Sequence, residues 1–201
     1  VCPCHPETGL HKMTTHYRVL RKYKSTIIDI LILITIFVFL LSYFTPNLFL
    51  SRNIPTGGDM ASHYYPAKYL KEALLPKGRI VGWLQGNYAG FPLFQVYFPF
   101  PFLLMVLLSY AIPMQIAFKI ISVIGVFSLP LCSYFAIKLM HYKFPCSIIG
   151  ALFTLPFLFM EANSMWGGNI PSTLAGEFAF SIGMSLSVLL LGTLYHGIGK
   201  K

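Results

Sequence analysis

The sequence predicts an all-α protein, a polytopic bundle of transmembrane helices. Of its 201 residues, 56% are hydrophobic and only 10% are charged, and the mean hydropathy is +0.67. Soluble chains carry about a quarter charged residues, so this composition excludes an ordinary soluble enzyme, a disordered chain and a disulfide-rich secreted module. Only six residues are acidic, against fifteen Lys and Arg. Because a charge is unfavourable in lipid, each acid outside the flanks of a span is a candidate functional residue.

The first predicted span covers residues 26–45, which matches the length of about 20 apolar residues that crosses the hydrocarbon layer. Four basic residues precede it: Arg18, Arg21, Lys22 and Lys24. The positive-inside rule therefore predicts that residues 1–25 form a cytoplasmic segment. Residues 1–12 resemble sequence upstream of a natural start at Met13. The chain ends directly after a span, so we expect it to be the N-terminal part of a longer protein.

Residues 98–201 are predicted to form the rest of the bundle. Three strongly apolar segments cover residues 116–140, 147–160 and 178–198, and with the first span they predict about four full spans. A shorter segment, residues 98–112, is bounded by prolines and either crosses the membrane or re-enters it. If it is re-entrant, the basic residues around 138–143 and at the C-terminus join the N-terminus in the cytoplasm. The positive-inside rule favours that alternative.

Residues 46–97 are predicted to form a long external loop that contains an amphipathic helix. After Gly57 and Gly58, apolar residues recur at steps of three and four: Met60, Tyr64, Ala67, Leu70 and Leu74. We expect such a helix to lie on the bilayer surface with this stripe facing the lipid. Lys68 and Glu72 are four residues apart and lie away from the stripe, a spacing that favours an ion pair.

Asp59 and His63 are also four residues apart and share one face at the start of this helix. An Asp after two glycines is a common helix N-cap, which is the structural interpretation. The functional interpretation is a carboxylate and an imidazole at the level of the lipid headgroups, where they can meet a phosphate, a metal ion or an acceptor hydroxyl. We favour the functional one for Asp59, because the chain contains so few acids.

A second loop, residues 161–177 (EANSMWGGNIPSTLAGE), is expected on the same side of the membrane as the first. Its glycine pair marks an irregular turn, and Pro171 suits the start of the helix that leads into the last span. Glu177 lies about one turn into that helix and is expected to face the first loop. Its alternative role is to interact with the helix dipole.

On these residues, the chain resembles the N-terminal part of a GT-C type integral membrane glycosyltransferase. The order of features carries the likeness: a span, an external loop that opens with Gly57-Gly58-Asp59, a loop helix, a Gly/Pro/aromatic run, closely spaced spans and a second external loop. More narrowly, GGDMASH and WGGNIPSTLAGEF are similar to the membrane family labelled 6-pyruvoyl-tetrahydropterin synthase-related. That label does not imply pterin chemistry, since the zinc-binding histidines of a pterin synthase have no counterpart here.

The GT-C resemblance implies transfer of a sugar from a polyprenyl-phosphate donor at the external membrane face. The partners that it implies are membrane lipid and the lipid-linked donor, with no nucleic acid. Its implied catalytic residues are Asp59, as base or metal-linked carboxylate, with His63 and Glu177. Substrate binding is expected at Lys68, Arg79, Trp166 and Asn169. The sequence contains no acidic DxD-type cluster, so the resemblance does not determine the cofactor. A divalent metal ion is the candidate.

The sequence is also compatible with two functions other than sugar transfer. One is a non-catalytic membrane subunit in which Asp59 and Glu177 serve only as helix caps. The other is a transporter or flippase module in which the proline-broken segment lines a path. Ion-coupled transport requires paired charges within the spans, and the sequence predicts no partner for Asp29 or Lys119. We therefore expect a multi-pass membrane enzyme rather than a transporter.

Overall fold

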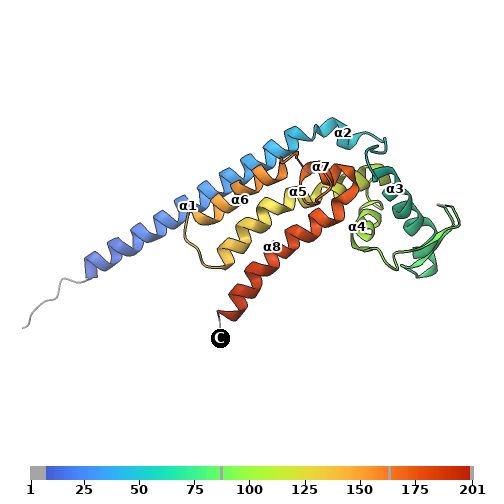
Figure 1. The fold of residues 1–201 in the computed structure, drawn as a ribbon. Helices are drawn as coiled ribbons and strands as arrows, with labels where there is room; N and C mark the ends of the chain where they lie inside the picture. Colours follow the sequence, from blue (N-terminus) through green and yellow to red (C-terminus); the bar gives the residue numbers. More distant parts are fainter. Residues whose placement is uncertain (1–7, 87, 163, 200–201) are drawn as a thin grey trace, which may run out of the picture.

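The structure is a computed structural model that describes residues 8–86, 88–162 and 164–199, with side chains described from residue 23 onward. Four helices run side by side through the molecule, and the shorter elements gather at one end of them (Figure 1). The long helices are α1 (Thr8–Tyr43), α5 (Met114–Leu139), α6 (Cys146–Leu158) and α8 (Phe178–Ile198). The predicted all-α transmembrane bundle is confirmed.

Among the described residues, three helical stretches are long and apolar enough to cross a membrane: Tyr23–Tyr43, Met114–Leu139 and Ile170–Ile198. The fourth predicted span, α6, has 13 residues. At 1.5 Å per residue it is about 20 Å long, shorter than a hydrocarbon core of about 30 Å. The bundle therefore contains three full-length candidate spans and one short apolar helix, instead of four full spans.

The proline-bounded segment forms α4 (Phe100–Leu108), a helix of 9 residues. Its length is about 14 Å, which is too short to cross the membrane. Pro99 is its N-cap and Pro101 lies in its first turn, where a missing N–H is tolerated. Because α4 stays at one end of the bundle, the start of α1, the α5–α6 turn and the end of α8 all lie at the opposite end (Figure 1).

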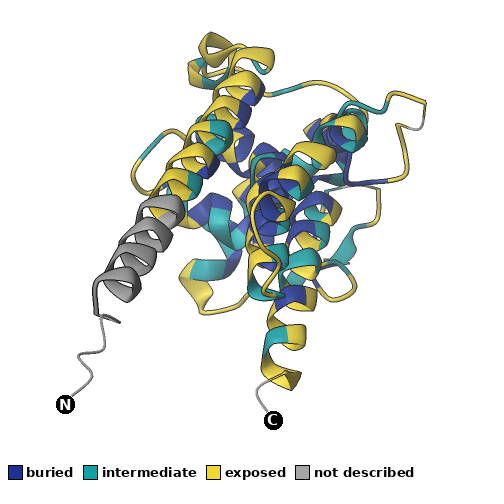
Figure 2. Cartoon of the chain, turned by 90° about the vertical axis from the view of Figure 1, so that its left-hand side faces the viewer, coloured by how far each residue is buried: buried dark blue, intermediate teal, exposed yellow. Residues whose placement is uncertain are grey.

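Helices α5 and α8 form the tightest contact in the bundle. A Cβ on Gly125 would lie 2.6 Å from the Ile182 nitrogen, and one on Gly192 would lie 2.5 Å from the Ala136 Cα. Ser185 Oγ also donates a hydrogen bond of 2.9 Å to the Gly125 carbonyl. Small residues allow membrane helices to approach this closely. Helix α1 packs less extensively, and exposed residues follow its length (Figure 2).

Asp29 and Lys119 both have protein partners, which corrects the expectation that they lack them. Tyr134 donates its hydroxyl hydrogen to Asp29 Oδ2 at 3.0 Å, and Lys138 Nζ lies 2.7 Å from the Tyr134 hydroxyl. Asp29 Oδ1 is buried without a hydrogen-bond partner among the described residues. Lys119 Nζ donates to the carbonyls of Leu48 and Ser51, both at 2.6 Å. These bonds connect α1 and the segment after it to α5.

The first loop folds against the bundle as several short elements. Helix α2 (Pro46–Leu50) is followed by α3 (Met60–Tyr69), a π-helical turn (Leu70–Leu74) and a 3-10 turn (Leu75–Lys77). Strands β1 (Gly82–Leu84) and β2 (Phe91–Leu93) then pair in an antiparallel hairpin, with Trp83 opposite Pro92.

The apolar stripe of the loop helix faces protein, which corrects the expectation that it faces the bilayer. Met60, Ala67, Leu70 and Leu74 are buried in one core cluster. That cluster also contains Phe102 and Met105 of α4, Phe118 and Ile121 of α5, and Phe178 and Ile182 of α8. The stripe is therefore buried by the apolar residues that the bundle presents at this end. This packing fixes the position of Asp59, the residue directly before Met60.

Candidate functional site

Each of the two acids that we singled out lies directly before a helix. Asp59 is the N-cap residue of α3, and Glu177 is the N-cap residue of α8. Neither carboxylate accepts a capping hydrogen bond from the described backbone. The interpretation of both acids as simple helix caps therefore lacks the bond that defines a cap. Asp59 is exposed and Glu177 is partly buried, so both carboxylates remain accessible for other interactions.

The two loops are in direct contact, as expected from the sequence. The Asp59 N–H donates a 2.7 Å hydrogen bond to the Ala175 carbonyl. Glycines make this approach feasible: a Cβ on Gly58 would lie 2.1 Å from the same carbonyl oxygen, and one on Gly176 would lie 3.0 Å from the Asp59 Cβ and 3.3 Å from His63 Cδ2. Gly176 also has φ = 123°, a backbone conformation that favours glycine.

The second loop also packs over Glu177. Gly167 has φ = 78°, and a Cβ there would lie 3.0 Å from Glu177 Oε2 and 2.5 Å from Phe180 Cδ1. A residue with a side chain at this position would collide with the aromatic ring beside the carboxylate. The glycine thus allows the loop to close against the start of α8 with Glu177 beside it.

His63 lies within a group of aromatic rings contributed by separate elements. Its ring stacks on Tyr97 at 5.6 Å between centroids and meets the edge of Phe178 at 5.2 Å. Phe102 of α4 lies 6.1 Å away. The Tyr97 hydroxyl is 3.4 Å from His63 Nε2, which is within hydrogen-bond reach. These contacts orient the imidazole at the end of the bundle where Asp59 and Glu177 also lie.

Burial and the two acids shift the pKa values of this pair. Burial lowers the pKa of His63 from its ordinary value, and the nearby negative charge of Asp59 partly opposes that shift. The pKa of Tyr97 is raised by burial, and further by the charges of Asp59 and Glu177. At neutral pH the imidazole is therefore neutral and the phenol is protonated, so Tyr97 can donate its hydrogen to Nε2. The charge of Asp59 therefore acts on both rings of this pair, and that of Glu177 acts on Tyr97.

Sequence reasoning missed Tyr97. The residue lies in the Gly/Pro/aromatic run before residues 98–112. The sequence carries no signal that separates it from the other aromatic residues of this run, because only the folded chain shows which ring reaches His63.

A pocket of about 400 Å³ opens beside this group. His63, Tyr97 and Phe102 line one part of it, and the remaining lining comes from α3 and the hairpin region: Ser62, Tyr65, Pro66, Leu84, Phe91, Leu93 and Val96. Ligand pockets commonly have volumes of about 300 to 1,000 Å³ and combine apolar walls with a few polar groups. The pocket has the size and composition of a small-ligand site.

The four predicted substrate-binding residues do not line this pocket in the described part of the chain. Lys68 and Arg79 are exposed, and Lys68 Nζ lies 4.0 Å from Glu72 Oε2, as its spacing predicted. Trp166 is 67% exposed, whereas Asn169 is 1% exposed. The Asn169 side chain accepts a hydrogen bond from the Ser172 N–H and donates one to the Met160 carbonyl, so it holds the second loop together.

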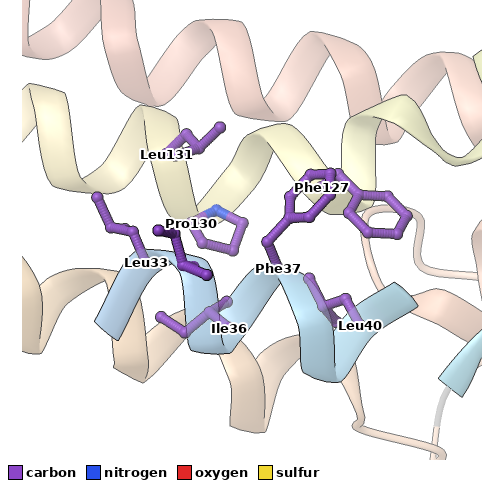
Figure 3. A pocket seen from close by; sticks show the side chains of 8 residues that line it. Leu33, Ile36, Phe37, Leu40, Phe127, Pro130 and Leu131 are labelled. Carbon is purple, nitrogen blue, oxygen red and sulfur yellow. The ribbon is translucent and has the colours of Figure 1, made fainter. Parts of the chain in front are cut away.

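A second pocket, of about 220 Å³, lies between α1 and α5 within the bundle (Figure 3). Its lining is formed by apolar side chains, among them Leu33, Ile36, Phe37, Leu40, Phe127, Pro130 and Leu131. These side chains form an apolar surface, which suits the hydrocarbon chain of a lipid. This pocket therefore presents no side chain suited to acid–base chemistry.

The described residues contain no group of three or more His, Cys, Asp or Glu side chains that could hold a metal ion. Asp59, His63 and Glu177 thus do not form such a set in this structure. Four side chains near the N-terminus are of types that bind metal ions: Cys2, Cys4, His5 and His11. They lie outside the residues whose side chains are described.

A family model for the 6-pyruvoyl-tetrahydropterin synthase related domain, described as a membrane protein, matches residues 94–201. That range is more than half of the 201-residue chain. The chain belongs to this membrane protein family. Neither the curated proteins nor the solved structures contain a match. The family domain includes Tyr97, the bundle from α4 to α8 and Glu177, whereas Asp59 and His63 precede it.

Proposed function

We propose that the chain is the N-terminal part of a GT-C type glycosyltransferase, which transfers a sugar from a polyprenyl-phosphate donor at the external membrane face. The observation that carries this proposal is the contact between the two loops, which brings Asp59 and His63 against the segment before Glu177, with His63 and Tyr97 lining a pocket at the loop end of a membrane bundle. A lipid-linked sugar presents its phosphate and its reacting carbon at the membrane surface, where a loop between spans can reach them. The family's membrane character is consistent with such a donor.

In the proposed reaction, Asp59 is the general base. It takes the proton of the acceptor hydroxyl while the acceptor oxygen forms a bond to the anomeric carbon of the sugar. The bond between that carbon and the phosphate oxygen breaks, and polyprenyl phosphate leaves with the bonding electrons. Asp59 suits this role because its carboxylate is exposed and makes no capping bond with the described backbone.

His63, Tyr97 and the exposed cations have supporting roles. Tyr97 positions the neutral imidazole by donating to Nε2, which leaves Nδ1–H as a donor for an oxygen of the sugar. Lys68 and Arg79 can bind the departing phosphate, since ammonium and guanidinium groups bind phosphate oxygens strongly. Glu177 lies at the same end of the bundle, directly before α8, and is the second proposed catalytic carboxylate. The proposed reaction has no step on a metal ion, because Asp59, His63 and Glu177 do not belong to a group of three or more metal-donor side chains among the described residues.

The test is Asp59→Asn in the full-length protein, assayed for sugar transfer from a polyprenyl-phosphate donor in membranes. Removing the base while keeping the side-chain shape is expected to lower the rate by about 10² to 10⁴-fold. Glu161→Gln is the matched control, because Glu161 is an exposed acid of the second loop that has no part in the proposed reaction. We expect this control to keep its activity.

Unchanged transfer in Asp59→Asn would exclude the catalytic role of this carboxylate. If the intact, folded protein shows no transfer with any polyprenyl-phosphate sugar, the remaining alternatives are a non-catalytic membrane subunit and a transporter or flippase module. The bonds made by Asp29 and Lys119 join helices to each other, so these charges are explained by packing without a transport path.

A further inference from the structure

The end of the bundle opposite the candidate site brings together two histidines from separate elements. His141 lies in the turn after α5, and His196 lies in the last turn of α8. His141 Nε2 and His196 Nδ1 are 3.0 Å apart, and the ring centroids are 4.9 Å apart. Neither the family nor the proposed glycosyl transfer accounts for this pair.

The close crossing of α5 and α8 holds the two rings in place. Gly192 and Ala136 lie about one helical turn before His196 and His141, and a Cβ on Gly192 would lie 2.5 Å from the Ala136 Cα. The two backbones are therefore in contact directly beneath the histidines. A pair supported by such packing is pre-organised, because neither helix can shift without disturbing the crossing.

The backbone at His141 gives a second observation. Its φ is 64°, in the left-handed region, and its N–H donates to the Lys138 carbonyl at 3.0 Å. Glycine is the usual residue in this conformation after a helix, because it has no Cβ to strain the backbone. The chain thus has an imidazole at a position whose backbone conformation favours glycine.

We propose that His141 and His196 bind a divalent transition-metal ion of the Cu²⁺ or Ni²⁺ type. Metal–imidazole bonds of about 2.0 to 2.1 Å at a right angle place the two nitrogens about 3.0 Å apart. The observed separation of 3.0 Å matches this geometry. Imidazole ligands in a tetragonal arrangement are typical of these two ions, and water molecules would complete the coordination.

The surroundings leave the site open to an ion from the aqueous phase. His141 is exposed and His196 is partly exposed. The nearest cation along α5, Lys138, directs its Nζ to the Tyr134 hydroxyl at 2.7 Å and lies 4.9 Å from that ring's centroid. Lys143 is exposed in the α5–α6 turn. A bound ion would add a connection between this turn and α8 beyond the helix crossing.

The experiment uses Cu²⁺ with the full chain in detergent. Every sample carries alanine at Cys2, Cys4, His5, His11 and His16, which removes other donors near the N-terminus. Electron paramagnetic resonance is expected to show coupling to two imidazole nitrogens. His141→Ala and His196→Ala should each lose the two-nitrogen pattern and weaken Cu²⁺ binding at least about tenfold.

His141→Gly is the sharper variant. Glycine suits the backbone conformation, so this variant should have a higher Tm than the parent chain without metal, yet it should lose the two-nitrogen spectrum. A simple hydrogen bond between neutral imidazoles explains the same 3.0 Å contact without a metal. Cu²⁺ binding that is absent from the parent, or equal in the parent and all three variants, would establish that explanation and overturn the proposal. Both readouts are independent of sugar transfer.

Discussion

The surroundings of His63 determine its protonation state and its hydrogen bonds. Its imidazole stacks on Tyr97 and meets Phe178, so most of its surroundings are apolar. An apolar environment disfavours the protonated ring, and the charge of Asp59 offsets this only in part. When the protonated Tyr97 phenol donates to Nε2, the neutral imidazole keeps Nδ1–H as a donor. Such a donor can recognise an oxygen of a sugar.

The lowered pKa of His63 predicts an acid-sensitive contribution to stability. Between its ordinary pKa of 6.5 and the lower folded value, the unfolded chain binds the proton more tightly than the folded chain does. Stability therefore falls as the pH falls through this window. His63→Phe keeps a ring against Phe178 but cannot titrate, so its Tm should fall less between about pH 7.5 and about pH 5.5. Equal falls in the variant and the parent chain would contradict this assignment.

At the scale of elements, the contact between the first and second loops depends on Gly176. Its φ is 123°, and a Cβ added there would lie 3.0 Å from the Asp59 Cβ, so the contact leaves no space for a side chain. Gly176→Ala should destabilise the folded chain by about 1 to 3 kcal/mol and disturb Asp59 and His63 together. Unfolding of the detergent-solubilised protein measures the first effect, and the sugar-transfer rate measures the second.

Gly183→Ala is the control for this substitution. Gly183 lies inside α8, where a Cβ would meet nothing within 4 Å. Alanine favours a helix over glycine by up to about 1 kcal/mol, so this variant should be slightly more stable. If both substitutions change stability equally, the contact between the loops does not depend on Gly176.

The sequence predicted the elements better than it predicted their partners. Composition and the length of the apolar segments are sufficient to predict the helices. The scarcity of acids identifies Asp59 and Glu177 as candidate site residues. The stripe of the loop helix was assigned to the wrong surface, because periodicity shows an apolar face without showing whether lipid or protein covers it. Asn169 looked like a ligand-binding residue, but a polar loop residue is equally suited to closing the loop's own backbone bonds.

At the scale of the whole molecule, the bundle has two chemically different ends. The loop end holds the pocket, His63 and both loop acids. The opposite end holds the start of α1 and the α5–α6 turn (Figure 1). Lys24 lies at the start of the candidate span Tyr23–Tyr43, and Lys138 and Lys143 flank the turn. Because α4 does not cross the membrane, both basic regions lie on one side. The positive-inside rule then supports our proposal that this side is cytoplasmic and that the loop end is external.

This orientation predicts opposite labelling for two cysteines. Trp166→Cys places a thiol on the second loop at a position that is 67% exposed. Native Cys146, exposed at the start of α6, is the matched control at the other end. In intact cells, a membrane-impermeant maleimide should label residue 166 in a chain whose Cys2, Cys4 and Cys146 are replaced by alanine. In a second chain that keeps only Cys146 and the buried Cys132, labelling should require permeabilised membranes. The reverse pattern would invert the molecule and place the candidate site in the cytoplasm, where an externally presented lipid-linked sugar could not reach it.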